Sequence, residues 1–383
     1  MKYKNSYLSY FLMYNFYYLS WALFSSLISV YLLNKGYKAS EVSLVVSISY
    51  LSSMIAQPFI GSLSDKYDIK KVNIVLFVLA ALGGIFFVLS KNLLMIVIGY
   101  SFVLTLINGT NPVMEKVATA SPYQYGKIRI WGTIGYALGS QLAGVIYDII
   151  SPEAIFVVFV FTMILCIIGL IGTQPDIKEN KIEEKTTRII DLFKNKKYLY
   201  YLVISGLFYG ITNIGHTYIP SMLTYDGLDV SAASTILSIA VLCEAPLVLF
   251  SNKFMDKIGN KTLLVIAYMI VIVQLFIYGF DLSLPLKVIA TLIAKHPAGM
   301  LFIMINLKVI NTLIDERQQI TALAFVQTIR NLTSIIFQNI AGNMLDITSY
   351  SNMFMVCLAV MMIGLLLVVF FKIDSGNDKK IFS

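Results

Sequence analysis

Charged side chains within long apolar stretches are the residues of this sequence that could do chemistry. Six of them stand in such stretches: Glu115, Lys116, Arg129, Glu244, Lys295 and Arg330. A charge at bilayer depth is costly, so it normally faces a protein interior or a water-filled cavity and has a partner. Acids and bases in that setting can hold a polar ligand, and a carboxyl group or a histidine can also exchange a proton.

The composition places these residues in a membrane protein. Apolar residues make up 58% of the 383 residues, charged residues make up 13%, and the mean hydropathy is +0.78. A protein surrounded by water does not have that balance. The net charge of +8 comes from Lys and Arg residues scattered between apolar runs, whereas nucleic-acid binding uses a basic face. We therefore expect a lipid bilayer around the chain and no nucleic-acid partner.

Twelve apolar stretches are long enough to cross the roughly 30 Å hydrocarbon core as helices. They lie near residues 7–33, 41–63, 72–90, 93–120, 127–149, 153–173, 198–223, 231–255, 262–281, 284–312, 317–345 and 350–372. The first lacks a small-residue cleavage site, so we expect it to remain as a helix. The predicted fold class is an all-α membrane protein with twelve transmembrane helices.

One long hydrophilic segment, residues 174–197, divides these stretches into two sets of six. It predicts a helical bundle at 1–173, a cytoplasmic linker at 174–197 and a second bundle at 198–383. With the N-terminus inside, the inner segments hold nineteen Lys and Arg residues and the outer loops hold four, which fits the positive-inside rule. We expect a multi-pass protein of the cell (inner or plasma) membrane with both termini in the cytoplasm.

Two charged loops repeat each other. The segment GSLSDKYDIKK ends the second stretch, and SNKFMDKIGNK ends the eighth. Three charged positions recur at a constant offset of 191 residues: Asp65, Lys66 and Lys70 in the first loop, and Asp256, Lys257 and Lys261 in the second. Together with Gly61 we interpret them as a conformational loop motif. The repeat predicts two pseudo-symmetric six-helix bundles.

The loop GSLSDKYDIKK resembles the cytoplasmic loop signature of the major facilitator superfamily, in which a Gly, an Asp and basic residues join the second and third helices. The resemblance implies the major facilitator fold and secondary transport. The Asp would cap and pair with helix ends, while the basic residues meet anionic headgroups and helix C-termini. The sequence departs from the signature at Asp68, where the family usually has Gly.

The segment NPVMEKVATASPYQYGKIRIWGTIGYALG looks like the hairpin of helices four and five in the lactose permease and nucleoside:proton symporter group. The residues that match the group's pattern are Pro112, Glu115, Tyr125, Gly126, Lys127, Arg129, Gly132 and Gly135. Glu244 matches the group's helix-eight acid, and Arg330 matches a basic position in helix eleven. Other charged positions of the lactose permease do not carry over, because they fall on Thr212, Gly215, Gln274 and near Ala298.

Glu115 and Arg129 are placed to pair. Glu115 lies seven residues before the turn centred near Pro122, and Arg129 lies seven residues after it. On adjacent antiparallel helices both would stand about 10 Å from the turn. The resemblance to the group's sugar-contacting pair implies a substrate clamp, in which Arg129 donates and Glu115 accepts hydroxyl protons. The alternative is a salt bridge that only holds the hairpin, and Lys116 is a weaker candidate.

In the second half, Glu244, Lys295 and Arg330 each fall about eleven to thirteen residues into their stretches, near the middle of the membrane. Charges at one depth suggest one cavity, in which Lys295 and Arg330 would contact the substrate. Glu244 is the candidate for proton coupling, because its protonation would respond to desolvation and to nearby bases. His296 could share that proton. For His216 we favour a packing role.

These residues predict a secondary active transporter that takes up a sugar, oligosaccharide or nucleoside with a proton, by alternating access of the two halves. The expected partners are that small molecule and the proton, and the protein is expected to be a monomer. Two alternatives stay open. One is uptake of an organic anion such as an aromatic carboxylate, since intramembrane bases outnumber acids by four to two. The other is multidrug efflux by proton antiport, although residues 131–148 lack the Gly-Pro pair usual in such exporters.

An enzyme, a cofactor and a metal site are not expected. The chain has two His residues and no HExxH, GxSxG or phosphate-binding Gly-rich motif, so a catalytic constellation has little to be built from. Its three cysteines, Cys166, Cys243 and Cys357, lie singly in apolar runs and suggest packing. A sensor on the same scaffold that does not transport stays an alternative.

Overall fold

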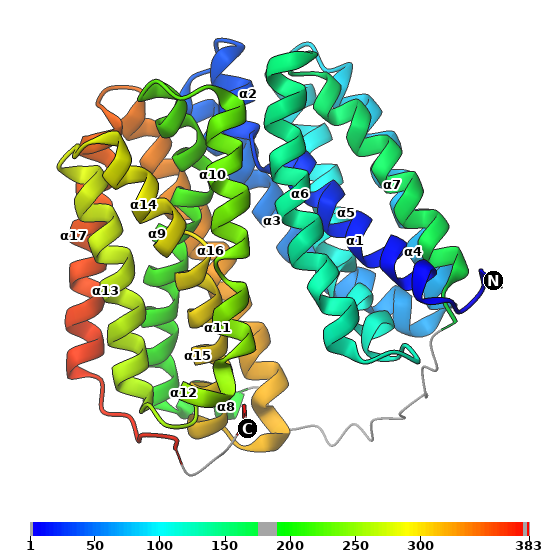
Figure 1. Cartoon of the computed structure of the whole chain (residues 1–383). Coiled ribbons are helices and arrows are strands. Elements are labelled where there is room, and N and C mark those ends of the chain that lie inside the picture. Colours follow the sequence, from blue (N-terminus) through cyan, green and yellow to red (C-terminus); the bar gives the residue numbers. More distant parts are fainter. Residues whose placement is uncertain (1–2, 175–189, 378–380, 383) are drawn as a thin grey trace. The chain divides into compact units, whose positions relative to one another are not determined.

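The computed structural model of the chain describes residues 3–174, 190–377 and 381–382, and every regular element in those ranges is a helix (Figure 1). Nine helical segments of the described residues are long and apolar enough to cross a membrane. They are α1 with α2 (Tyr7–Ser25, Ile28–Asn34), α3 (Ala39–Lys66), α4 (Ile69–Val88), α5 (Leu93–Thr119), α7 (Ala154–Gly172), α10 with α11 (Val230–Leu242, Ala245–Leu249), α13 (Asn260–Gly279), α14 with α15 (Leu284–Ala294, Pro297–Leu313) and α17 (Tyr350–Phe370).

Three further helices have membrane length but are less apolar. They are α6 (Tyr125–Ile149), α9 (Lys196–Tyr225) and α16 (Gln319–Leu345), with 25, 30 and 27 residues. Two of them carry a charged candidate residue in their interior, Arg129 in α6 and Arg330 in α16. With the nine apolar segments they make twelve among the described residues, which confirms the predicted number. The short helices α8 (Ile190–Lys194) and α12 (Ser251–Phe254) and a 3₁₀ turn (Glu316–Gln318) complete the described elements.

Two of the twelve segments are interrupted next to a proline. The first ends at Leu242 and resumes as α11 at Ala245, and the second ends at Ala294 and resumes as α15 at Pro297. Proline has no backbone N–H, and its ring clashes with the carbonyl four residues earlier. Pro246 and Pro297 thus account for both interruptions. Glu244 lies in one interruption, and the pair Lys295 and His296 lies in the other. These three candidate residues therefore stand where the regular helical hydrogen bonds are interrupted.

The described residues form two compact units, each packed mainly against itself. The first holds the described residues before position 175 together with Pro220–Leu242, and the second holds the described residues from 190 to Ile219 and from Cys243 onward. Helix α10 thus groups with the first unit, whereas the sequence assigns it to the bundle at 198–383. The linker at 174–197 lies largely outside the described residues, so the domain boundaries stay a prediction.

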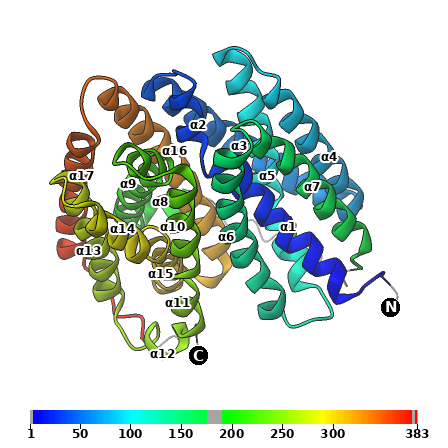
Figure 2. The same ribbon diagram turned by 45° about the horizontal axis from the view of Figure 1, so that its top comes forward.

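In the first unit, helix α1 lies between α6 and α7 (Figure 2). Glycines let the backbones approach closely, as is common between membrane helices. A methyl group on Gly135 of α6 would come within 2.3 Å of the carbonyl oxygen of Asn15, and one on Gly169 of α7 within 2.2 Å of the amide nitrogen of Met13. These contacts fix α1 against both neighbours, and with it the tyrosines that α1 carries.

The repeated lysines make equivalent contacts in the two units. Lys70, at the start of α4, donates to the carbonyl oxygens of Ile171 (2.9 Å) and Thr173 (2.5 Å) at the end of α7. Lys261, at the start of α13, donates to the carbonyl oxygen of Val369 (2.5 Å) at the end of α17. A lysine that binds the last carbonyls of a helix satisfies groups that have no partner within the helix. The internal repeat read from the sequence therefore has a structural counterpart in each unit.

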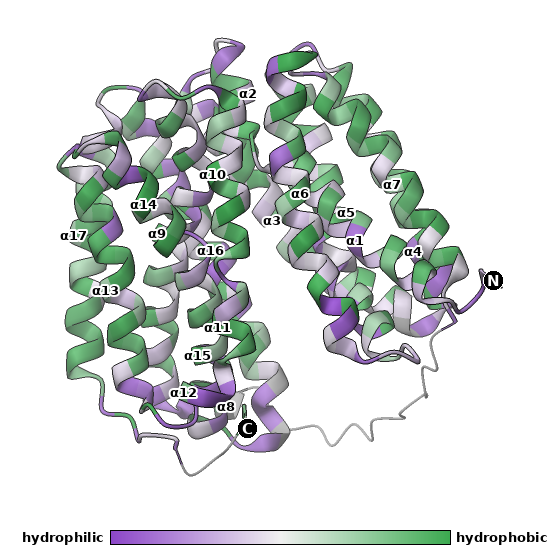
Figure 3. Ribbon diagram, in the orientation of Figure 1, coloured by the Kyte–Doolittle hydropathy of each residue, from purple (hydrophilic) through white to green (hydrophobic). Residues whose placement is uncertain are grey.

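Large apolar side chains are exposed along the outer helices, as a lipid environment requires. Phe161 of α7, Ile293 of α14 and Phe370 of α17 are 62%, 60% and 73% exposed. Figure 3 shows hydrophobic residues along α7, α13 and α17, with hydrophilic residues nearer the helix ends. A water-soluble protein rarely exposes so much contiguous apolar surface. The protein is a multi-pass membrane protein.

Close packing of α1 on α6 gives a test of this arrangement. We expect Gly135→Ala to lower the thermal stability, because overpacking typically costs about 1–3 kcal/mol. Gly126→Ala on the same helix is the matched control, since a methyl group there meets nothing within 4 Å. Thermal unfolding of the purified variants in detergent measures the difference. Equal stability of the two variants would contradict the packing described here.

Asp68 caps helix α4, and the cap predicts a pH dependence. Its carboxylate accepts the backbone N–H groups of Lys71 (3.1 Å) and Lys70 (2.9 Å), which hold the pKa of Asp68 below its usual value. The stabilisation is therefore present above the unfolded pKa of about 3.9 and is lost as the pH falls through the lower folded pKa.

We expect Asp68→Ala to lose about 0.5–2 kcal/mol of stability at pH 7, the usual cost of removing an N-cap. The gap to the wild type should narrow below about pH 4, where the Asp68 carboxylate protonates in the unfolded chain before it does in the folded protein. Asp68→Ser keeps a capping oxygen without a titrating group, so it should retain most of the stability. The comparison is made by thermal unfolding at a series of pH values, and a gap that stays constant with pH would refute the cap.

Candidate functional site

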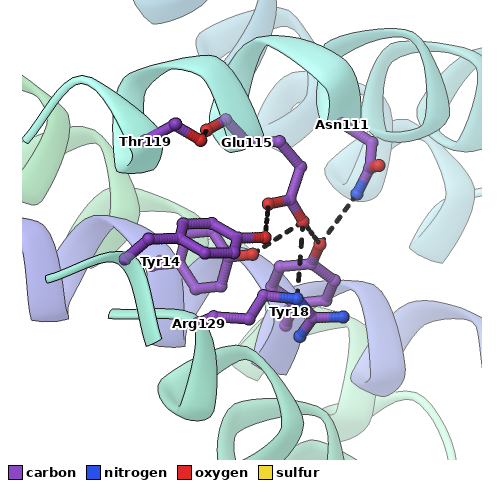
Figure 4. Close-up of polar contacts among 7 residues, drawn as sticks. Tyr14, Tyr18, Asn111, Glu115, Thr119 and Arg129 are labelled. Atoms are coloured by element: carbon purple, nitrogen blue, oxygen red, sulfur yellow. Dashed lines mark hydrogen bonds and ion pairs between the residues drawn. The ribbon is translucent and has the colours of Figure 1, made fainter. Parts of the chain in front are cut away.

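The carboxylate of Glu115 is the centre of a polar cluster inside the first unit (Figure 4). Its Oε1 accepts hydrogen bonds from the hydroxyls of Tyr14 (2.7 Å) and Tyr18 (2.8 Å), and its Oε2 accepts one from Tyr125 (2.7 Å). Arg129 forms an ion pair with it, with Nε 3.8 Å from Oε1. We call these five residues the Glu115 cluster. A carboxylate with this many donors stays charged within a membrane at lower cost.

Three helices supply the Glu115 cluster. Glu115 lies four residues before the end of α5, and Arg129 four residues after the start of α6. At 1.5 Å per residue, both stand about 6 Å from the helix ends. Tyr14 and Tyr18 are four residues apart on α1 and therefore share one helix face. The expected distance of about 10 Å was counted from the centre of the turn, whereas these roughly 6 Å are counted from the helix ends, which residues 120–124 separate.

The ion pair with Glu115 leaves the two Nη groups of Arg129 available to donate hydrogen bonds to a ligand. The contact uses Nε, and Figure 4 shows the two Nη groups on the side of the guanidinium that faces away from Glu115. The side chains of Arg129 and Glu115 are 32% and 30% exposed. The guanidinium carbon also lies 5.7 Å from the ring centre of Tyr18, a cation–π distance. The arrangement offers both hydrogen-bond donors and a carboxylate acceptor to a ligand.

Sequence reasoning named Tyr125 only as part of the hairpin pattern, and it missed Tyr14, Tyr18 and Asn111. The Asn111 amide donates to the Tyr18 hydroxyl (3.1 Å). The signal was the spacing of four between Tyr14 and Tyr18, which places two hydroxyls on one face of the first helix. In a segment with this many aromatic residues, that spacing is equally typical of packing. Neighbouring Tyr17 is buried like Tyr14 and Tyr18, but its hydroxyl donates to the carbonyl oxygen of Ile107 and not to Glu115.

Basic side chains gather in the second unit. The rings of His216 (α9) and His296 have centroids 5.4 Å apart, and Nζ of Lys295 lies 3.4 Å from Nε2 of His296. Arg330 packs against Tyr209 of α9, the helix that carries His216, with its guanidinium carbon 4.7 Å from the Tyr209 ring centre. We call His216, Lys295, His296 and Arg330 the basic cluster. His216, which the sequence assigned to packing, is thus next to His296.

Arg330 is held in place by neighbours on two helices. Its guanidinium carbon lies 4.7 Å from the ring centre of Tyr209, and the Tyr209 hydroxyl accepts a hydrogen bond from Asn306 (2.6 Å). Ser334, one turn further along α16, donates to the Arg330 carbonyl oxygen and accepts from Asn213 of α9. These contacts fix α9 against α16, so the guanidinium has a defined position. Arg330 is therefore anchored on α9, the helix that also carries His216.

Glu244 also belongs to the second unit. It stands between α10 and α11, is partly exposed, and its carbonyl oxygen accepts the N–H groups of Leu247 (3.1 Å) and Val248 (3.3 Å). The interruption ahead of Pro246 exposes backbone groups that an uninterrupted helix would use internally. Broken helices of this kind border ion and substrate sites in many transporters. A coupling role for Glu244 and His296 stays a prediction.

The loop motif lies at the ends of α3 and α12. Gly61 falls within α3, and a methyl group there would meet nothing within 4 Å. Lys66, the last residue of α3, places Nζ 5.6 Å from the ring centre of Tyr67. The side chain of Asp65 lies outside the described part of the structure. The first copy of the motif therefore lies mostly in the last turns of α3. The connection between α3 and α4 is only two residues long.

The second copy of the motif contacts the C-terminal segment. Oδ1 and Oδ2 of Asp256 accept the N–H groups of Ile381 (3.2 Å) and Phe382 (3.1 Å). The backbone oxygen of Lys257 accepts from the amide of Asn377 (3.0 Å). Asp256 thus binds the C-terminal segment, and Lys261 binds the end of α17.

The side chains that bind metals do not gather in the described ranges. No group of three or more His, Cys, Asp or Glu side chains there could hold a metal ion. The three cysteines are free thiols, and Cys166 and Cys357 are buried.

Comparison with known proteins gives the family. The family model described as "Major Facilitator Superfamily" matches residues 10–316 and 227–382. The maltose permease of Geobacillus stearothermophilus is 24% identical over 380 residues, covering 95% of each chain. The sucrose permease of Escherichia coli is 23% identical over 295 residues, covering 71% of each chain.

A solved structure shows the same fold. The crystal structure of a point mutant of the nucleoside transporter NupG superposes with a TM-score of 0.84 at 15% identity, covering 94% of this chain and 98% of that one. The family model covers nearly the whole chain, and the twelve membrane-length helices agree with it. This chain belongs to the Major Facilitator Superfamily of membrane transporters.

Proposed function

We propose that this transporter takes up a sugar, oligosaccharide or nucleoside together with a proton, and that the Glu115 cluster binds the substrate's hydroxyl groups. The proposed cycle is alternating access, in which the site opens to one side of the membrane at a time. The proposed orientation, from the positive-inside rule, has both termini in the cytoplasm. The permeases and the nucleoside transporter that resemble the chain are named for substrates of this chemical class.

The observation that carries the proposal is the set of three phenol hydroxyls on one carboxylate. Tyr14, Tyr18 and Tyr125 donate to Glu115 at 2.7–2.8 Å. A substrate hydroxyl makes the same kind of bond, so it can replace a phenol hydroxyl without leaving the carboxylate unsatisfied. The Nη groups of Arg129 can donate to other substrate oxygens. The cluster can therefore exchange internal hydrogen bonds for bonds to a polyhydroxylated ligand.

A purely structural salt bridge would be built differently. An ion pair that only fastens a hairpin gains from a direct contact of two guanidinium nitrogens with two carboxylate oxygens. Here the ion-pair contact between the two side chains is 3.8 Å through Nε, and both side chains keep about a third of their surface exposed. That geometry favours a ligand-binding role.

Uptake into proteoliposomes tests the clamp. We expect Arg129→Gln to reduce uptake about tenfold or more, because charge-assisted hydrogen bonds contribute roughly 1.5–3 kcal/mol each. The substrate is first chosen by a thermal-shift screen of sugars and nucleosides on purified protein. Lys127→Gln is the matched control, since it removes an exposed positive charge from the same helix. Full uptake by a folded Arg129→Gln protein would overturn the assignment.

Proton coupling is tested at Glu244. With Gln at this position the site cannot release a proton, so we expect accumulation against a gradient to be lost while exchange down a gradient continues. Counterflow and proton-driven uptake are compared in the same proteoliposomes. Glu153→Gln is the control, because that carboxylate pairs with Lys35 (2.9 Å) outside the membrane-spanning helices. Unchanged accumulation by Glu244→Gln would place the coupling proton elsewhere.

A further inference from the structure

The basic cluster has more basic side chains than a neutral sugar needs as hydrogen-bond donors. His216 comes from α9, Lys295 and His296 from the interruption between α14 and α15, and Arg330 from α16. The two histidine rings are 5.4 Å apart, and Lys295 and His296 approach to 3.4 Å. Basic groups at this spacing repel one another when protonated, most strongly where the surroundings are apolar. The second unit therefore brings basic side chains from three helical segments together, and an anion bound beside them would favour their protonated forms.

Backbone groups add to that potential. Helix α15 has 17 residues and begins at Pro297, directly after His296. Pro297 has no N–H, and the Met300 N–H bonds to the His296 carbonyl (3.0 Å). The N–H groups of Ala298 and Gly299 therefore carry the positive end of the helix dipole here. Gly299 lies in this first turn, and a methyl group there would meet nothing within 4 Å. The start of α15 therefore presents peptide dipoles and open space beside Lys295 and His296.

The donors in the basic cluster also have fixed positions. Arg330 lies against Tyr209 at 4.7 Å, and Tyr209 is bonded to Asn306. Backbone hydrogen bonds hold the chain on both sides of Lys295 and His296. The Lys295 N–H donates to the Thr291 carbonyl oxygen, and the His296 carbonyl oxygen accepts the Met300 N–H. Prearranged donors bind an anion with less loss of freedom than flexible ones. A guanidinium fork and an ammonium group are the usual partners of carboxylate and phosphate.

We propose that the basic cluster binds an anionic oxygen group, a carboxylate or a phosphate, carried by the transported molecule. The inference rests on the proposed function and narrows its substrate class to acidic derivatives, such as a uronic acid or a sugar phosphate. Lys295 and Arg330 supply the charge, His216 and His296 supply further N–H donors, and the start of α15 supplies peptide N–H groups.

Binding of matched probes to the full-length protein in nanodiscs tests the proposal. The probes are glucuronate against its neutral amide glucuronamide, and glucose 6-phosphate against glucose, each titrated by calorimetry. We expect at least one anion to bind about tenfold or more tightly than its neutral partner, as charge-assisted bonds predict. A preference for glucuronate identifies a carboxylate, and a preference for glucose 6-phosphate identifies a phosphate. If neither anion binds more tightly than its partner, the proposal is overturned.

Variants connect the preference to the residues. Lys295→Gln and Arg330→Gln should each reduce the anion preference about tenfold, whereas Lys253→Gln, an exposed charge in the same unit, should leave it unchanged. An anion preference that survives both cluster variants would overturn the assignment. The wild-type comparison stands even if a variant fails to fold. Failure of the proposed function would show separately, as full uptake by Arg129→Gln, which these titrations do not measure.

Discussion

A charge inside the membrane must be satisfied by the protein, and this constraint shapes the first unit around Glu115. Three tyrosine hydroxyls and Arg129 surround its carboxylate. Two of those tyrosines come from α1, which can reach Glu115 only because Gly135 and Gly169 let it pack directly against its neighbours. Helix packing therefore determines the chemistry of the cluster. The glycine contacts position the tyrosine hydroxyls, and the hydrogen bonds from these hydroxyls lower the cost of the Glu115 charge within the membrane.

The second unit is under the same constraint, but most of its candidate residues are bases. Three of its candidates, Glu244, Lys295 and His296, lie where Pro246 and Pro297 interrupt transmembrane segments, so these side chains stand beside backbone groups released from the helical hydrogen-bond pattern. The first unit offers an acid with exchangeable hydroxyl donors, and the second offers a cluster of bases. Guanidinium and ammonium groups suit an acidic oxygen group, which is why the proposed substrate class is narrower than that of a neutral sugar.

The sequence predicted the helices and the repeat well, because hydropathy and charge placement are properties of single residues summed along the chain. Lys70 and Lys261 were matched by a constant offset, and both bind helix ends. The three tyrosine partners of Glu115 were not predicted, since which aromatic side chain turns inward depends on how α1 rotates against α6. His216 was assigned to packing for the same reason: its neighbour His296 is 80 positions away, and no local pattern joins them.

The central claim is that Glu115 and its donors hold the substrate, and ligand-dependent stability measures this most directly. A bound ligand raises the melting temperature by an amount that grows with its affinity for the folded state. The transported substrate is added to the wild type and to Glu115→Gln, each shown to fold without it. We expect the substrate to raise the melting temperature of the wild type and to leave that of Glu115→Gln nearly unchanged. An equal rise in both proteins would contradict a substrate-binding role for Glu115.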